Sequence, residues 1–245
     1  MVAARSGAST LTRSLTSEPN SERGSVVNVV LMGPPGAGKG TQAGTVASLV
    51  GVTHVASGDL LRELVKLDTE QAHAVKAYMD RGELVPDELT LAIVMARLSE
   101  PDCRNGFILD GFPRTVAQAR ALDEKLAKSG RQIDRVINLV VPEEVLLARL
   151  SGRWLCQNCH ASYHAVFSPP KVPGICDRCG GTLYQREDDT LQTARHRLDV
   201  YERDTLPVLE YYRTTHDLVD VSGNGVVGEV SEALREAIMT PPSEV

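Results

Sequence analysis

The chain has 245 residues, of which 42% are hydrophobic and 4% aromatic, and its formal net charge is −6. A chain of this length can form one α/β core with one or two small inserted lobes. The acidic balance argues against nucleic acid as the main partner. No apolar run approaches the roughly 20 residues that span a bilayer, so we expect a soluble protein without membrane contact.

The first 25 residues are rich in serine and threonine and carry arginines, with no acidic residue before Glu18. This composition is typical of an organellar transit segment and equally of a disordered bacterial extension. We favour the extension, which leaves residues 1–25 outside the fold and the protein in the cytoplasm. Organellar import stays open as the alternative.

A glycine-rich segment, residues 33–41, directly follows a β-branched strand predicted at residues 26–32 and reads Gly-Pro-Pro-Gly-Ala-Gly-Lys-Gly-Thr. Such a turn opening a helix is the context of a phosphate-binding loop, because backbone N–H groups and the helix N-terminus attract an anion. Lys39 can reach the outer phosphates, and Thr41 can offer its hydroxyl to Mg²⁺. Gly40, which separates them, departs from the general pattern, and a turn that binds nothing is the alternative. We predict that this loop binds nucleoside phosphates.

Strands and helices alternate along the chain. Five strands are predicted at residues 26–32, 53–56, 107–110, 136–141 and 217–221. Helices are predicted from residue 57 onward and at residues 41–50, 69–81, 87–99, 115–128, 143–150, 191–213 and 226–239. Ser57 is expected to cap the helix that it precedes. The alternation predicts an α/β fold, a parallel five-stranded sheet with helices on both faces.

Two stretches are predicted as inserts in this core. Residues 57–85 form a helical insert between strands, and residues 153–189 form a short lobe that contains cysteines and prolines. The remaining segments form the core, at residues 26–56, 86–152 and 190–239, followed by a tail at 240–245.

Charged and polar side chains follow the predicted strands. Ligands of open parallel sheets bind beyond the carboxyl ends of the strands, so the glycine-rich loop, Ser57 and Asp110 should share one cleft. Asp110 is placed like the acid that holds Mg²⁺ through its waters, with helix capping as the alternative. Five arginines near strand ends or insert borders suggest a cleft that grips several phosphates. They are Arg62, Arg114, Arg153, Arg186 and Arg197.

Four of the five cysteines form two Cys-x2-Cys pairs, Cys156/Cys159 and Cys176/Cys179, separated by sixteen residues. This spacing is typical of a tetrahedral Cys₄ zinc site in a reducing compartment, with free or redox-active thiols as the alternative. A lobe under about 40 residues has too little core to fold unaided, so the metal would be structural. His160 and His164 are possible substitute ligands. The fifth cysteine, Cys103, is expected to be half-buried.

One further motif, Asp110-Gly111-Phe112-Pro113-Arg114, completes a set with the glycine-rich loop, Ser57-Gly58-Asp59 and Arg186-Glu187-Asp188-Asp189. From residue 27 to about 239, the chain resembles adenylate kinases of the long bacterial type with a lid insert. The resemblance implies the phosphate-loop nucleoside monophosphate kinase fold, with residues 57–85 as the AMP-binding insert and 153–189 as a zinc-containing lid. It also implies reversible transfer from Mg·ATP to AMP, which gives two ADP.

The resemblance also implies residue roles. The catalytic residues would be Lys39, Asp110, Arg114, Arg153, Arg186 and Arg197. ATP would contact Gly36, Ala37, Gly38, Lys39, Gly40, Thr41, Arg153, Ser162, Tyr163 and Gly225. AMP would contact Ser57, Arg62, Glu83, Leu84, Val85, Gly111, Phe112, Pro113, Arg114, Gln118, Arg186 and Arg197. Ser57 replaces a commoner threonine and keeps its hydroxyl. Glu83 replaces a commoner lysine, at a contact expected to use the main chain.

Other functions remain as alternatives. A kinase for UMP, CMP or GMP is one, but the Gln118 amide can pair with N1 and N6 of adenine and mismatches guanine. GTP is not excluded as the phosphate donor. A nucleotide-dependent nucleic-acid binder with a zinc ribbon is a distant alternative, which the acidic charge and the lack of a basic, aromatic-rich patch argue against. We expect a monomer whose partners are ATP, AMP and ADP.

Overall fold

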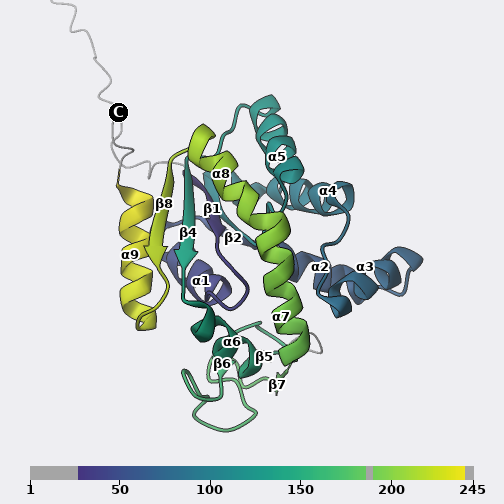
Figure 1. Cartoon of the computed structure of the whole chain (residues 1–245), viewed down its shortest axis with the longest axis vertical. Helices are drawn as coiled ribbons and strands as arrows, with labels where there is room; N and C mark the ends of the chain where they lie inside the picture. The colour runs from purple at the N-terminus through teal and green to yellow at the C-terminus, as the bar shows by residue number, and fades with distance from the viewer. Residues whose placement is uncertain (1–26, 186–189, 241–245) are drawn as a thin grey trace, which may run out of the picture.

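The structure, a computed structural model, describes residues 27–185 and 190–240 (Figure 1). The predicted extension at residues 1–25, Arg186 and most of the predicted tail lie outside the described residues. Within the described part of the chain, no helix combines the length and the apolar character needed to cross a membrane.

The core is a five-stranded sheet in the order β2-β3-β1-β4-β8, and every pairing is parallel. The strands are β1 (Val27–Met32), β2 (Thr53–Ala56), β3 (Gly106–Asp110), β4 (Arg135–Val140) and β8 (Leu218–Ser222). The three central strands are buried almost throughout, as their continuous apolar runs require in a sheet covered on both faces. The predicted α/β fold class is confirmed.

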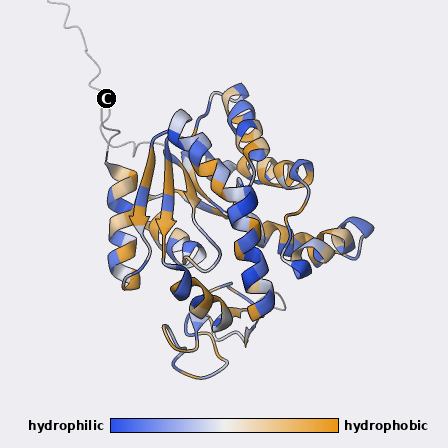
Figure 2. Cartoon of the chain, in the orientation of Figure 1, coloured by the Kyte–Doolittle hydropathy of each residue, from blue (hydrophilic) through white to orange (hydrophobic). Residues whose placement is uncertain are grey.

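Alternate side chains of β1 enter two separate apolar clusters. Val30 and Met32 pack on the side of the sheet that carries α4, α5 and α8, whereas Val29 and Leu31 pack on the side of α1 and α9. This is the two-residue period of a strand that is buried on both faces. Figure 2 shows largely hydrophobic strands surrounded by helices that carry both hydrophilic and hydrophobic residues. The helices are α1 (Lys39–Val50), α4 (Asp87–Leu98), α5 (Val116–Lys128), α6 (Glu143–Ser151), α8 (Leu206–Thr215) and α9 (Val227–Met239).

The helical insert consists of α2 (Ser57–Val65) and α3 (Glu70–Arg81). It has its own apolar cluster around Leu61, Val75 and Val85. The predicted capping role of Ser57 is wrong, because Ser57 is already the first helical residue and its buried hydroxyl donates to the Gly111 carbonyl at 2.7 Å. This tertiary contact takes the hydroxyl that a cap would use.

Gly82 ends α3 in the left-handed region, with φ at 75°. A Cβ at this position would lie 2.8 Å from Cγ of Arg197 and 3.2 Å from Cγ2 of Thr193. Both contacts come from α7 (Leu191–Val200), the helix that follows the lid. Glycine is required here by conformation and by space.

The lid contains a three-stranded antiparallel sheet in the order β6-β5-β7. Its strands are β5 (Arg153–Cys156), β6 (Ser162–His164) and β7 (Leu183–Tyr184). The lid's apolar cluster is small, and two of its five buried members are cysteines: Cys156, Ala161, Tyr163, Cys176 and Leu183. Val166 and Phe167 are exposed at 76% and 60%. The lid therefore buries little apolar surface of its own.

The long helix predicted over residues 191–213 is interrupted. Between α7 and α8, residues Tyr201–Thr205 form a π-helical segment. Pro207 has no N–H to donate to the carbonyl four residues before it, which removes one regular helical hydrogen bond near this point. The hydroxyl of Thr205 donates to the backbone carbonyl of Arg114 at 3.0 Å. The interruption thus lies beside the predicted cleft, where such segments are often found.

Candidate active site

The glycine-rich loop connects β1 to α1 beyond the carboxyl end of the strand. Gly38 precedes the helix in the left-handed region, with φ at 96°, and no side chain caps the helix. At Gly36, where φ is 86°, a Cβ would lie 2.8 Å from the carbonyl oxygen of Leu146. The loop therefore needs glycine at both positions. Because no side chain caps α1, the backbone N–H groups at its N-terminus can bind an anion.

Lys39 lies within this loop. Its Nζ donates to the carbonyls of Gly33 and Pro34 at 2.6 and 3.0 Å. Burial lowers the pKa of Lys39 to about 8, while Asp110 opposes this shift and Arg114, Arg197 and Arg153 add to it. Four of the predicted catalytic residues, one acid and three arginines, are therefore close enough to Lys39 to act on its charge.

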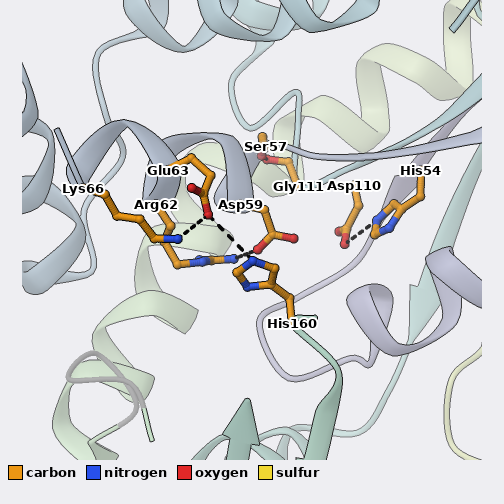
Figure 3. Close-up of polar contacts among 9 residues, drawn as sticks. All are labelled: His54, Ser57, Asp59, Arg62, Glu63, Lys66, Asp110, Gly111 and His160. Carbon is orange, nitrogen blue, oxygen red and sulfur yellow. Dashed lines mark hydrogen bonds and ion pairs between the residues drawn. The ribbon is translucent and has the colours of Figure 1, made fainter. Parts of the chain in front are cut away.

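Asp110 ends β3 and is 9% exposed. Its Oδ2 lies 3.6 Å from Nε2 of His54, on the neighbouring strand β2 (Figure 3). A Cβ on Gly40 would also lie 3.6 Å from this oxygen, so the first turn of α1 runs next to the carboxylate. A carboxylate near a phosphate loop, with the hydroxyl of Thr41 in the same turn, is an oxygen donor set that suits Mg²⁺.

The turn after Asp110 joins three parts of the cleft. Gly111 has φ at 76°, and its carbonyl accepts from both the Ser57 hydroxyl and Nε of Arg114, each at 2.7 Å. Phe112 and Pro113 are buried, which fixes the turn against the core. Figure 3 shows Ser57, Gly111 and Asp110 beside one another, so the predicted convergence of these strand ends is confirmed.

Gln118, in the first turn of α5, is 2% exposed, and its amide oxygen and amide nitrogen each form one hydrogen bond within the protein. Its Oε1 accepts from the backbone N–H of Arg114 at 2.7 Å, and its Nε2 donates to Oδ1 of Asp87 at 2.6 Å. The other carboxylate oxygen of Asp87 accepts from the Thr115 hydroxyl at 2.8 Å. Asp87 was not among the residues predicted from the sequence.

The insert presents its predicted residues in different ways. Arg62 forms an ion pair with Asp59, one turn earlier on α2 (Figure 3). The Glu83 carboxylate forms an ion pair with Arg81 at 2.8 Å. The predicted contact of Glu83 with the AMP base uses the main chain, so this ion pair does not interfere with it. Val85 is 5% exposed and packs in the insert's apolar cluster, whereas Leu84 is half-buried.

The four lid cysteines gather in one cluster. Their sulfur atoms all lie within 4.8 Å of one another, with Cys156 to Cys179 and Cys159 to Cys176 both at 3.5 Å. These separations are too long for disulfides. They are close to the about 3.8 Å between sulfurs that Zn–S bonds of about 2.3 Å require in a tetrahedron. The cluster therefore fits a tetrahedral, thiophilic metal ion.

Tyr163 belongs to the same cluster. Its hydroxyl accepts from the backbone N–H of Asp177 at 2.7 Å and lies 3.4 Å from the sulfur of Cys176. This contact lowers the pKa of the Cys176 thiol and favours the thiolate that a metal binds. His164 instead accepts from the backbone N–H groups of Val166 and Phe167, outside the thiol cluster.

His160 extends from the lid toward the helical insert. Its Nε2 lies 3.7 Å from Oε1 of Glu63 on α2, and the same oxygen pairs with Lys66 at 2.6 Å (Figure 3). The two inserts thus face each other across the cleft. Cys103, by contrast, is far from this chemistry and is fully buried in the core, so the expectation of a half-buried thiol is wrong.

The family "Adenylate kinase" matches residues 31–217 of the chain. This chain belongs to the adenylate kinase family. The adenylate kinase of Carboxydothermus hydrogenoformans is 51% identical over 212 residues, which cover 86% of this chain and 99% of that protein. That of Methanocella arvoryzae is 53% identical over 209 residues, which cover 85% and 97%. That of Archaeoglobus fulgidus is 51% identical over 216 residues, which cover 86% and 99%.

As a member of the adenylate kinase family, the chain is an enzyme of the nucleotide-binding kinases, a family that generally uses Mg²⁺ with ATP. The adenylate kinase fold brings the phosphate loop, Ser57, Asp110 and Arg114 together. Gly225 lies exposed in the loop between β8 and α9, while Ser162 is half-buried in β6. Arg186 lies outside the described residues.

Arg149 is a further member of the site that the sequence analysis missed. Its Nη1 donates to the carbonyl of Gly223 at 3.0 Å and to that of Ala37 at 3.4 Å. Burial lowers the pKa of this arginine. The side chain therefore links α6, the phosphate loop and the loop that carries Gly225. Its one sequence signal is its position four residues before Arg153.

Proposed function

We propose that this chain catalyses the Mg²⁺-dependent reaction ATP + AMP = 2 ADP in the cleft between the lid and the helical insert. One observation carries this proposal most directly: Lys39 lies in a phosphate loop, with Asp110 and Arg114, Arg153 and Arg197 near enough to alter its pKa. Several fixed positive charges suit two phosphate chains placed end to end. Phosphoryl transfer needs such positioning and charge neutralisation more than covalent help.

Lys39 has a defined part in this proposal. Burial lowers its pKa to about 8, and Arg114, Arg197 and Arg153 add smaller lowering effects that Asp110 opposes. Bound phosphates would raise this pKa again and replace the carbonyls that Nζ now contacts. The ammonium group would then neutralise charge on the transferred phosphoryl group, together with the arginines, among them Arg186.

Mg²⁺ bound with ATP would neutralise the phosphate oxygens. Thr41 and Asp110 would hold the ion, Asp110 through its waters. On the ATP side, the loop from Gly36 to Gly40 would enclose the phosphates, while Arg153, Ser162, Tyr163 and Gly225 would contact the rest of the nucleotide. On the AMP side, Ser57, Arg62, residues 83–85, the turn at 111–114 and Gln118 would form the acceptor site.

We propose that the lid binds one structural zinc ion through Cys156, Cys159, Cys176 and Cys179. All four ligands are thiols, so no coordination position is left for substrate. Closing of the lid and the insert over the cleft would exclude water, which otherwise would hydrolyse ATP. The zinc-binding thiols must stay reduced, which supports a reducing compartment such as the cytoplasm. We also propose that the protein acts as a monomer.

The deciding experiment measures diphosphate formation by the purified protein. Mg·ATP is offered with AMP, GMP, CMP or UMP, and Mg·GTP is offered with AMP. We expect ADP to form from ATP and AMP with a specificity constant at least about tenfold above any other pair. Equal use of GTP would identify a GTP:AMP phosphotransferase, and preference for another monophosphate would contradict the AMP assignment. Tight binding of oligonucleotides without any transfer would support the nucleic-acid alternative.

A further inference from the structure

Asp87 is the first residue of α4 and connects this helix to the start of α5. Its Oδ1 accepts from Nε2 of Gln118 at 2.6 Å, and its Oδ2 accepts from the hydroxyl of Thr115 at 2.8 Å. The Gln118 oxygen accepts in turn from the backbone N–H of Arg114 at 2.7 Å. The Asp87 carboxylate thus binds the nitrogen of the Gln118 amide, and the Arg114 backbone N–H binds its oxygen.

This network determines which way the amide points. An ionised carboxylate only accepts hydrogen bonds, and a backbone N–H only donates. The Gln118 nitrogen must therefore face Asp87, and its oxygen must face Arg114. The reverse orientation would place oxygen against a carboxylate and NH₂ against N–H. Because Gln118 is 2% exposed, no bulk water is available to compensate such a flip.

The amide has two N–H donors and two oxygen lone pairs, and the network uses one of each. One donor and one acceptor remain side by side, in an order that Asp87 fixes. They complement a base edge with an acceptor beside an amino donor, as in adenine (N1 and the 6-amino group). They mismatch an N–H beside a carbonyl, as in guanine, hypoxanthine and uracil. Since Gln118 is buried, a base reaches this pair only when neighbouring groups move aside.

We infer that Asp87 is a specificity-determining positioning residue, which locks the Gln118 amide in the orientation that accepts a 6-amino purine and rejects a 6-oxo purine. This inference rests on the proposed function, because it takes Gln118 as the contact to the acceptor base. It adds a residue that does not touch the nucleotide. The carboxylate acts through the amide, and an uncharged acceptor of the same shape can replace it only in part.

The test compares AMP with inosine monophosphate (IMP), which differs at the 6-position and at N1 of the purine. Initial rates with Mg·ATP give the ratio of kcat/KM for AMP to that for IMP. The full-length wild-type enzyme should prefer AMP by about 100-fold or more, as expected where a mismatched partner leaves buried polar groups unpaired. In Asp87→Ala the amide loses one of its two anchors, and the ratio should fall about tenfold or more.

Two matched variants separate this effect from a structural role. Asp87→Asn can still accept from Gln118 with Oδ1 and donate to Thr115 with Nδ2, so it should keep most of the preference. Thr115→Ala breaks the contact to the other carboxylate oxygen and removes the cap of α5, so it should lower the melting temperature without changing the AMP to IMP ratio.

Three results would overturn the inference: wild type using IMP as well as AMP, folded Asp87→Ala with an unchanged ratio, or Thr115→Ala lowering the ratio as much as Asp87→Ala. If Asp87→Ala does not fold, equal use of IMP and AMP by the wild type would still overturn the inference. A wild-type enzyme that forms no diphosphate from any monophosphate would instead contradict the proposed function. The failure of the proposed function can thus be distinguished from the failure of the inference about Asp87.

Discussion

The helical insert and the lid meet at His160 and Glu63 but are stabilised differently. The insert joins two helices through buried Leu61 and Val75, and Thr69 caps α3 by accepting from a backbone N–H. The lid has three short strands, and cysteines supply two of its five buried apolar positions. Two amphipathic helices can be held by apolar burial, whereas a lobe of short strands needs a cross-link at its centre.

The difference implies that the two lobes can be weakened separately. Loss of metal should loosen the lid first, and loss of apolar volume should loosen the insert first. Removal of the charges around Lys39, by contrast, should loosen neither lobe. The following expectations run from the largest effect to the smallest.

Lys39→Ala removes the charge at the centre of the cleft and leaves both lobes intact. We expect turnover to fall by about a hundredfold or more, because a positioned charge near the transferred phosphoryl group is lost. The melting temperature and metal content should stay near those of wild type. Steady-state rates, thermal unfolding and metal analysis check this. Near-normal turnover would show that Lys39 is not at the transferred phosphate.

Replacing Cys156 and Cys159 with serine should abolish metal binding and lower the melting temperature. Hydrogen exchange should rise first in residues 153–185 and stay low in the helical insert, since metal binding provides folding free energy to the lid alone. Activity at low temperature should fall less than in Lys39→Ala. The matched control, Cys103→Ala, loses a thiol outside the cluster and should keep one zinc per chain. Metal-free wild type with four titrating thiols and the same melting point would contradict the zinc assignment.

Val75→Ala should weaken the insert selectively. Val75 is 1% exposed, and removing two methyl groups with partial collapse of the cavity costs about 1–3 kcal/mol of unfolding free energy. The KM for AMP should rise more than that for ATP, with metal content unchanged. Gln71→Ala, at an exposed position of the same helix, is the control and should change little. An equal rise of both KM values would argue against assigning this insert to AMP.

ATP binding should depend on pH through Lys39. Burial lowers the pKa of Lys39 to about 8, and bound phosphates would raise it, so Mg·ATP binding should take up a proton above about pH 8 and progressively less below it. Affinity should fall by at most about tenfold per pH unit in that range. Calorimetry in buffers of different ionisation enthalpy measures the uptake. The same uptake in Lys39→Ala would assign the proton to another group.

Much of the fold follows from local patterns. The apolar runs at β1, β3 and β4 identify buried strands, and the glycines before Lys39 identify a turn that side chains would block. The acid at the end of β3 and the spacing of the cysteines are also recognisable from a short stretch of sequence. These features were predictable because the physics that requires them acts within a few residues.

Features that depend on distant segments were missed or misassigned. Ser57 has the sequence signature of a cap, but the Gly111 carbonyl, 54 residues away, takes its hydroxyl. Arg149 joins the site only because the fold brings Ala37 and Gly223 to it. Asp87 looks like an ordinary acid in the first turn of a helix, and its contact with Gln118 exists only once α4 and α5 are packed.

The glycine at the end of α3 has a consequence for the contact between α3 and α7. A single methyl group at Gly82 would collide with Arg197 and Thr193, so the missing side chain sets the closest approach of α3 to α7. Because α7 begins directly after the lid and carries Arg197, that approach also sets how far the arginine stands from the insert. One hydrogen atom in place of a methyl group thus lets the end of α3 lie directly against the side chains of the helix that carries Arg197.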